Sequence, residues 1–135
     1  MLERLRPRLR TYRDEAGREL FDVEDGLLTD PDTPAPVRFL PQYDNVFLSH
    51  DDRARINGVM TWGLEFGWKG AILVDGGITG AWRVKRAGGT ATMTVELGRE
   101  LTSGERAELE AEADALARFL DPDAPRELLI VATEA

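Results

Sequence analysis

The most regular alternation of hydrophobic and polar residues lies between Thr90 and Leu97. A period of two is typical of a strand with one buried and one exposed face. Upstream, residues 71–74 and 78–85 are separated by Asp75-Gly76-Gly77, which favours a tight hairpin turn. Ala87-Gly88-Gly89 supplies a second turn. We therefore predict a three-stranded antiparallel meander, with its last strand pointing these residues inward: Ala91, Met93, Val95 and Leu97.

A helix and a last strand are predicted after the meander. Thr102 and Glu105 have the spacing of a capping box, and an apolar stripe follows on an otherwise acidic helix. The stripe comprises Leu109, Ala113, Leu116, Ala117 and Leu120, and Pro122 and Pro125 end the helix. Leu128–Ala132 is an unbroken apolar run, which predicts a strand covered on both faces. The predicted fold class is α+β, with a curved antiparallel, partly barrel-like sheet, one long C-terminal helix and a final strand.

The N-terminal half has weaker patterns. Leucines at helical spacing are interrupted by Pro7, so residues 1–13 are interpreted as a basic linker or helix remnant and residues 14–135 as one domain. A turn at residues 15–18 leads to a short strand, Glu19–Val23, and a proline-rich connector spans residues 28–36. Five side chains are the expected buried anchors of the next segment: Val37, Phe39, Tyr43, Val46 and Phe47. A helical turn at 51–58 and an aromatic-rich loop around Gly63 and Gly67 are expected to follow.

Composition limits the class of protein. The chain has 135 residues, no cysteine and a net charge of −8. Disulfides and thiolate metal sites are thereby excluded, and the sequence predicts neither a secretory signal nor a membrane-spanning segment. We predict a cytoplasmic location and no membrane partner.

Basic residues are grouped despite the acidic total. Residues 1–13 contain five arginines, and Arg83, Lys85 and Arg86 form a second cluster. Arg83 and Lys85 alternate with Trp82 and Val84, so both are predicted on one face near a hairpin tip, where a phosphate backbone can be contacted. Cationic side chains also protect sheet edges from pairing, and the pattern alone slightly favours this second interpretation.

No catalytic site is predicted. Ser49, His50 and Asp51 are consecutive, but members of a triad are distant in sequence because each must face the next. His50 is the sole histidine, and with nearby aspartates it offers only a generic cation site. The glycine-rich turns lack the lysine and hydroxyl residue of a phosphate loop. We therefore predict neither a metal nor a cofactor. A small enzyme using His50 and nearby aspartates is the least favoured alternative.

Two strings carry a family resemblance: RFLPQYDN at residues 38–45 and LSHDDR at residues 48–53. DEAGRELFDVED and DPDTPAPVRFLP precede or lead into them, and ILVDGGITGAWRVKR follows. In this order the segments resemble the bacterial winged-helix DNA-binding-domain family, which includes the AlkZ-like and YcaQ-like DNA glycosylases that unhook interstrand crosslinks. The resemblance runs from about Leu9 onward and implies the C-terminal, β-barrel-like part of such a protein.

The resemblance also implies where catalysis lies. Glycosylases of the family use an N-terminal Gln-x-Gln or Gln-x-Asp motif, and Gln42-Tyr43-Asp44 has that spacing. We reject this match, because the family has the LPQYDN segment in addition to its catalytic motif. The catalytic region has no counterpart in this chain.

The sequence therefore predicts a non-catalytic, DNA-associated accessory domain, either a truncated family member or a separate protein that works with a partner. Expected partners are double-stranded DNA, a winged-helix protein or a second copy of the chain. The alternative is a protein-interaction or homodimerisation module that does not bind DNA. The candidate DNA-binding residues are Arg83, Lys85 and Arg86 on the hairpin, followed by His50, Arg53 and Arg55.

Overall fold

The computed structural model describes residues 2–49, 53–54, 56–58, 67–123 and 125–132. The chain divides into two compact units, Met1–Thr33 and Pro34–Ala135. The boundary predicted after residue 13 stays a prediction. The helical turn predicted at 51–58 and the aromatic loop around Gly63 lie largely outside the described residues. No helix in the described ranges combines the length and the apolar character needed to cross a membrane.

The first unit is a two-stranded ladder preceded by short helical segments. α1 (Leu2–Leu5) continues into the 3-10 turn η1 (Arg6–Arg8), and β1 (Leu9–Arg13) pairs antiparallel with β2 (Glu19–Val23). β2 confirms the predicted strand, whereas β1 had no signal in the pattern. Arg6 joins the segments, because it forms ion pairs with Glu3 at 3.0 Å and Glu19 at 2.6 Å and lies 4.6 Å from the centroid of the Phe21 ring.

The second unit contains a five-stranded sheet in the order β3-β4-β5-β6-β7. Its strands are β3 (Arg38–Leu40), β4 (Gly70–Val74), β5 (Gly77–Ala87), β6 (Thr90–Leu97) and β7 (Arg126–Ala132). The β4-β5-β6 part confirms the predicted meander. The prediction of a fully antiparallel sheet is wrong. A helix connects β6 to β7, and β7 pairs parallel with β6. β3 and β7 form the two edges, so the described strands make an open sheet and no closed barrel.

Both predicted hairpin turns have the positive φ angles that glycine and aspartate tolerate. Asp75 and Gly76 have φ angles of 50° and 75°, and Gly88 and Gly89 have 57° and 81°. Two consecutive positive φ angles match the right-handed twist of the strands that such turns join. The second turn closes the β5–β6 ladder at the Ala87–Thr90 pair. This ladder extends past Gly70, the first residue of β4.

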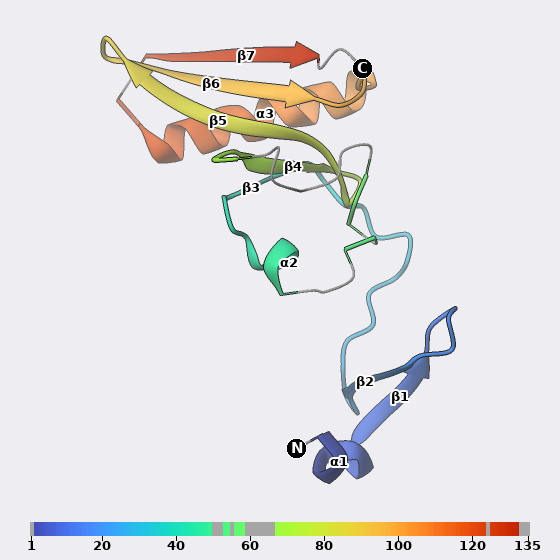
Figure 1. Ribbon diagram of the computed structural model, residues 1–135. Coiled ribbons are helices and arrows are strands. Elements are labelled where there is room, and N and C mark those ends of the chain that lie inside the picture. The colour runs from blue at the N-terminus through green and yellow to red at the C-terminus, as the bar shows by residue number, and fades with distance from the viewer. Residues whose placement is uncertain (1, 50–52, 55, 59–66, 124, 133–135) are drawn as a thin grey trace. The chain divides into compact units, whose positions relative to one another are not determined.

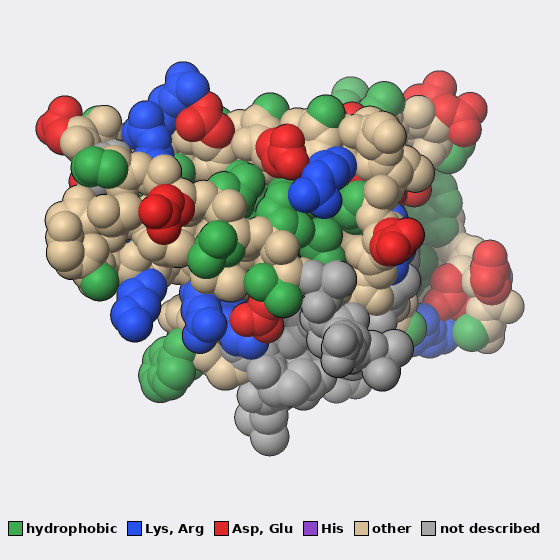
Figure 2. Space-filling view, turned by 90° about the horizontal axis from the view of Figure 1, so that it is seen from above, with side chains coloured by type: hydrophobic (Ala, Val, Ile, Leu, Met, Phe, Trp, Pro, Cys, Tyr) green, Lys and Arg blue, Asp and Glu red, His purple; other side chains and the backbone are tan. Residues whose placement is uncertain are grey.

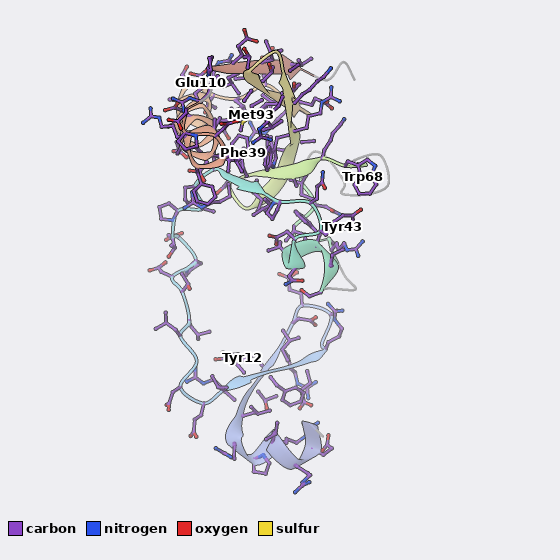
Figure 3. The ribbon with its side chains drawn as sticks, turned by 90° about the vertical axis from the view of Figure 1, so that its left-hand side faces the viewer. Tyr12, Phe39, Tyr43, Trp68, Met93 and Glu110 are labelled. Atoms are coloured by element: carbon purple, nitrogen blue, oxygen red, sulfur yellow. The ribbon has the colours of Figure 1, made fainter. Side chains whose placement is uncertain are left out.

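The main core lies between one face of the sheet and the helix α3 (Ser103–Leu120) (Figure 1). The predicted capping box is confirmed, as is the inward face of β6, where Met93 and Val95 are buried. Leu109 and Ala113 of α3 are also buried, and Leu116 and Ala117 pack against this core. Figure 3 places Phe39 and Met93 on the side of the sheet that α3 covers.

A second, smaller core covers part of the opposite face of the sheet. It consists of Phe47, Ala71, Ile78 and Ala81. Phe47 comes from the short helix α2 (Asn45–Leu48), where Asp44 caps the N-terminus by accepting a hydrogen bond from the Val46 amide at 2.8 Å. The short helix thereby positions one side chain against the sheet.

The predicted burial is only partly confirmed. Val37 and Phe47 are buried and Phe39 is half-buried, but Tyr43 is 56% exposed and Val46 37% exposed. α2 is a single turn and turns Phe47, not Val46, to the sheet. The prediction that β7 is covered on both faces is wrong as well. Leu129 and Val131 are 51% and 50% exposed, because α3 covers only one face of this edge strand.

Candidate nucleic-acid interface

The β5–β6 hairpin presents two of the predicted DNA-binding residues on one face. Arg83 and Lys85 are exposed, and they pair across the ladder with Thr94 and Thr92. Trp82 and Val84, which alternate with them, pack against the main core. Among the described residues neither Arg83 nor Lys85 has an ion-pair partner. Two cations therefore project from a rigid strand with their charge uncompensated by a salt bridge.

Arg86 follows on the opposite face of β5, the face that also carries Trp82 and Val84, and is held there by the end of α3. Its Nε donates to the Asp121 carboxylate at 3.0 Å, and its Nη2 donates to the Leu120 carbonyl at 3.4 Å. Asp121 is the C-terminal capping residue of α3. Arg86 thus links the hairpin to the C-terminal end of α3, and the Asp121 carboxylate partly neutralises its charge.

Of the second predicted group, His50, Arg53 and Arg55, the structure describes Arg53. Arg53 donates its Nε to the carbonyl of Phe47 at 2.6 Å, so it fixes the segment that follows α2. His50 and Arg55 lie outside the described residues. The structure therefore brings Arg83, Lys85 and Arg86 together on one hairpin and assigns a structural contact to Arg53. On the face drawn in Figure 2, several Lys and Arg side chains gather toward the lower left.

A surface hollow next to the hairpin was not anticipated from the sequence. It has a volume of about 450 Å³. Its lining residues come from the segment after β3, the segment that leads into β4, the second half of β5 and the end of α3: Pro41, Gln42, Tyr43, Trp68, Gly70, Trp82, Arg83, Val84, Arg86 and Leu120. The ladder between β4 and β5 ends at the Gly70–Trp82 pair, so from Arg83 onward no described residue pairs with the β4-facing edge of β5. The hollow lies along that edge.

The described members of the candidate catalytic strings have structural roles. Gln42 donates its side-chain amide to the carbonyl of Trp68, and Asp44 caps α2. Ser49 donates its hydroxyl to the Asn45 carbonyl. Within the described part of the chain no three His, Cys, Asp or Glu side chains are grouped as metal ligands would be. The described residues of both strings therefore stabilise the local backbone.

Two carboxyl groups show the electrostatics of structural acids. Two hydrogen bonds from the Arg99 guanidinium, at 2.6 and 2.9 Å, and one from the Thr102 amide at 2.8 Å lower the pKa of Glu105 to about 2. The Arg18 side chain and amide likewise lower the pKa of Asp14. A proton donor at neutral pH requires a raised carboxyl pKa, so both groups are suited to permanent charge instead.

One solved structure with a similar fold is the Streptomyces sahachiroi DNA glycosylase AlkZ, with a TM-score of 0.55 and 19% sequence identity. The match covers 96% of this chain and 35% of that chain, so the present chain spans about a third of that structure. No curated protein matches the sequence. The family described as DNA glycosylase AlkZ-like matches residues 1–119. The chain therefore belongs to the AlkZ-like DNA glycosylase family.

Proposed function

We propose that this chain is a non-catalytic, DNA-associated accessory domain that contacts the phosphate backbone of double-stranded DNA through the β5–β6 hairpin. The observation that carries the proposal is the position of Arg83 and Lys85. Both are exposed on one face of β5 and lack an ion-pair partner among the described residues, in a chain whose net charge is −8. An acidic protein that leaves two adjacent cations unpaired on a rigid hairpin has a local surface for phosphate oxygens.

The absence of catalysis is part of the proposal. It is supported by the structural roles of Gln42 and Asp44. In this proposal the chemistry of the family resides in a region that this chain does not contain. The cytoplasmic location predicted from the sequence belongs to the same proposal.

Fluorescence anisotropy with a labelled 20-base-pair duplex, measured at several salt concentrations, tests the hairpin contact. Each phosphate contact contributes about −0.9 to the slope of log affinity against log salt. The double variant Arg83→Gln/Lys85→Gln is expected to bind more weakly and to lose up to about 1.8 of that slope. Charge reversal of both residues to Glu is expected to weaken binding further.

The matched control is Arg106→Gln/Arg118→Gln on α3, which changes the net charge equally. These arginines pair with Glu110 and Asp114 of the same helix. If both double variants lower affinity and slope alike, binding follows total charge and the hairpin has no special role. If the wild-type chain shows no salt-dependent binding of duplex DNA, the proposed function is wrong.

A second function is favoured by one observation on β7. This edge strand exposes about half of Leu129 and of Val131 on the face away from α3. Exposed apolar residues on an unpaired edge are a surface for strand pairing with another chain. The alternative is therefore a homodimerisation module. Sedimentation equilibrium tests it: a dimer in the wild type and a monomer in Leu129→Thr/Val131→Thr support the alternative, and a monomeric wild type excludes it.

A further inference from the structure

The hollow beside the hairpin has two exposed aromatic side chains on its rim. Trp68 is 76% exposed and Tyr43 is 56% exposed. Their ring centroids are 6.3 Å apart and their planes meet at 82°, an edge-to-face pair. Figure 3 shows both side chains on the opposite side of this unit from Glu110 of α3. Neither ring belongs to the two hydrophobic cores. Large aromatic groups that contribute little to a core and lie together over a hollow are typical of a binding surface.

The backbone holds Tyr43 in place at a conformational cost. Its φ is 59°, in the left-handed region that a bulky residue rarely adopts. Contacts on both sides maintain this geometry, because Gln42 donates to the Trp68 carbonyl and Asp44 caps α2. Unfavourable backbone conformations that the surroundings enforce are concentrated at functional sites. The Gln42 contact also links the two segments that present the aromatic rings, so Tyr43 and Trp68 form one preorganised unit.

The other lining residues determine the chemistry of the ligand. The apolar contributions come from Pro41, Val84 and Leu120, and the charged ones from Arg83 and Arg86, with no carboxylate among the described lining residues. A volume of about 450 Å³ lies within the range of small-molecule sites, which runs from roughly 300 to 1,000 Å³. Aromatic rings with adjacent guanidinium groups bind single nucleotides, since the rings stack on a base while the cation contacts its phosphate.

Arg83 connects this hollow to the proposed duplex-binding surface, because it lines the hollow and lies on the same strand face as Lys85. A nucleotide of a bound DNA molecule is therefore the occupant that the position favours over a free metabolite or a peptide.

We propose that the hollow bounded by Tyr43, Trp68 and Arg83 binds one unpaired nucleotide of a DNA molecule whose duplex part lies against the β5–β6 hairpin. This inference rests on the proposed DNA-binding function and assigns the hollow the role of a reader of unpaired bases. Tyr43 and Trp68 would contact the base, and Arg83 would contact its phosphate. The preference comes from stacking and is consequently tolerant of base identity.

The test compares two labelled duplexes that differ only in one extra, unpaired thymine at the centre. The wild-type chain is expected to bind the bulged duplex at least about fivefold more tightly, the lower end of what one base stacked on an aromatic side chain contributes. Tyr43→Ala/Trp68→Ala is expected to abolish the preference while retaining affinity for the paired duplex. Tyr43→Phe/Trp68→Phe keeps an aromatic ring at each position and is expected to retain the preference.

Phe119→Ala is the matched control, because Phe119 is 83% exposed on α3 and is not among the residues lining the hollow. Its preference should equal that of the wild type. Thermal unfolding of each variant verifies that it is folded. A wild-type chain that binds both duplexes equally overturns this inference and leaves the proposed function intact, as does a preference that persists in Tyr43→Ala/Trp68→Ala. A chain that binds neither duplex overturns both.

Discussion

Trp82 donates its indole N–H to the main-chain carbonyl of Leu40 at 2.9 Å and so joins the middle of β5 to the last residue of β3. The same ring meets Phe39 edge-to-face, with centroids 5.8 Å apart. The contact spans 42 positions in sequence and lies at the wall of the hollow. It therefore fixes the position of the segment that carries Tyr43 relative to the strand that carries Arg83.

Trp82→Phe keeps an aromatic ring but removes the indole N–H. It should lower the free energy of unfolding by about 1–3 kcal/mol, because the partly buried Leu40 carbonyl loses its donor. Trp68→Phe is the matched control. Trp68 is 76% exposed, so its replacement should change stability by less than about 0.5 kcal/mol. Urea denaturation followed by far-UV circular dichroism measures both. Equal destabilisation by the two variants would contradict a structural role for the Trp82–Leu40 contact.

Gly70 leaves the space in which this contact forms. A Cβ atom at Gly70 would lie 2.2 Å from the Trp82 Nε1 and 2.3 Å from the Leu40 oxygen. Gly70→Ala is therefore expected to cost about 1–3 kcal/mol through overpacking, since both neighbours would have to move. Gly104→Ala has open space in the first turn of α3 and should instead stabilise the protein by up to about 1 kcal/mol. The opposite signs, measured in the same denaturation experiment, distinguish local packing from a general effect of alanine.

The start of α3 should respond to acid. The pKa of Glu105 is lowered from 4.5 to about 2 by the hydrogen bonds from Arg99 and Thr102. The folded protein therefore binds this proton more weakly than the unfolded chain does. The resulting stabilisation is complete above about pH 4.5 and is lost as the pH falls toward 2. Glu105→Gln keeps a capping-box residue but cannot titrate there.

Urea unfolding midpoints of the wild type and Glu105→Gln at pH 7 and pH 3 measure this pH-dependent stabilisation. The wild type should lose more stability between the two pH values than Glu105→Gln does. A direct check is an NMR titration, in which the Glu105 carboxyl signal should have its midpoint near pH 2. A midpoint near 4.5 would mean that the ion pair with Arg99 does not persist in solution.

The sequence predicted the parts of the fold that depend on neighbouring residues. The alternation at Thr90–Leu97, the glycine turns and the Thr102–Glu105 spacing each specify a local geometry, and all three are confirmed. The direction of β7 was missed because an unbroken apolar run has no signal for the orientation of its neighbour. β1 was missed for two reasons. The spacing of its apolar residues resembled that of a helix, and most of its residues pair with positions of β2 that lie ten or more residues later in the sequence.

The candidate interface likewise has a part that local sequence patterns predict and a part that depends on tertiary contacts. The common exposed face of Arg83 and Lys85 could be predicted, because alternation along one strand determines it. The hollow was missed because its residues come from four segments, and Tyr43 was assigned to the core by its hydrophobicity alone. The signal in the sequence was the turn Pro41-Gln42-Tyr43-Asp44, where Asp44 marks the start of α2 and leaves Tyr43 outside it. Tertiary pairing, not local pattern, brings Trp68 to Tyr43.

Asp121 restrains Arg86, so removing its charge should strengthen DNA binding. The ion pair of 3.0 Å joins side chains that are 55% and 32% exposed, and such surface pairs contribute at most about 1 kcal/mol. Asp121→Asn releases Arg86 toward a phosphate and removes one negative charge beside the hairpin. Affinity for duplex DNA should rise about two- to fivefold, and the salt slope should grow by up to about 0.9.

Asp114→Asn is the control for this last prediction, because it removes the same charge from a pair with Arg118 on the same helix. It should leave affinity and slope within the error of the wild type. Arg86→Gln combined with Asp121→Asn should cancel the gain, since the released cation is then missing. If Asp121→Asn has no effect while Arg83→Gln/Lys85→Gln weakens binding, Arg86 serves only to fasten the hairpin to α3, and the phosphate contacts are confined to the outer face of β5.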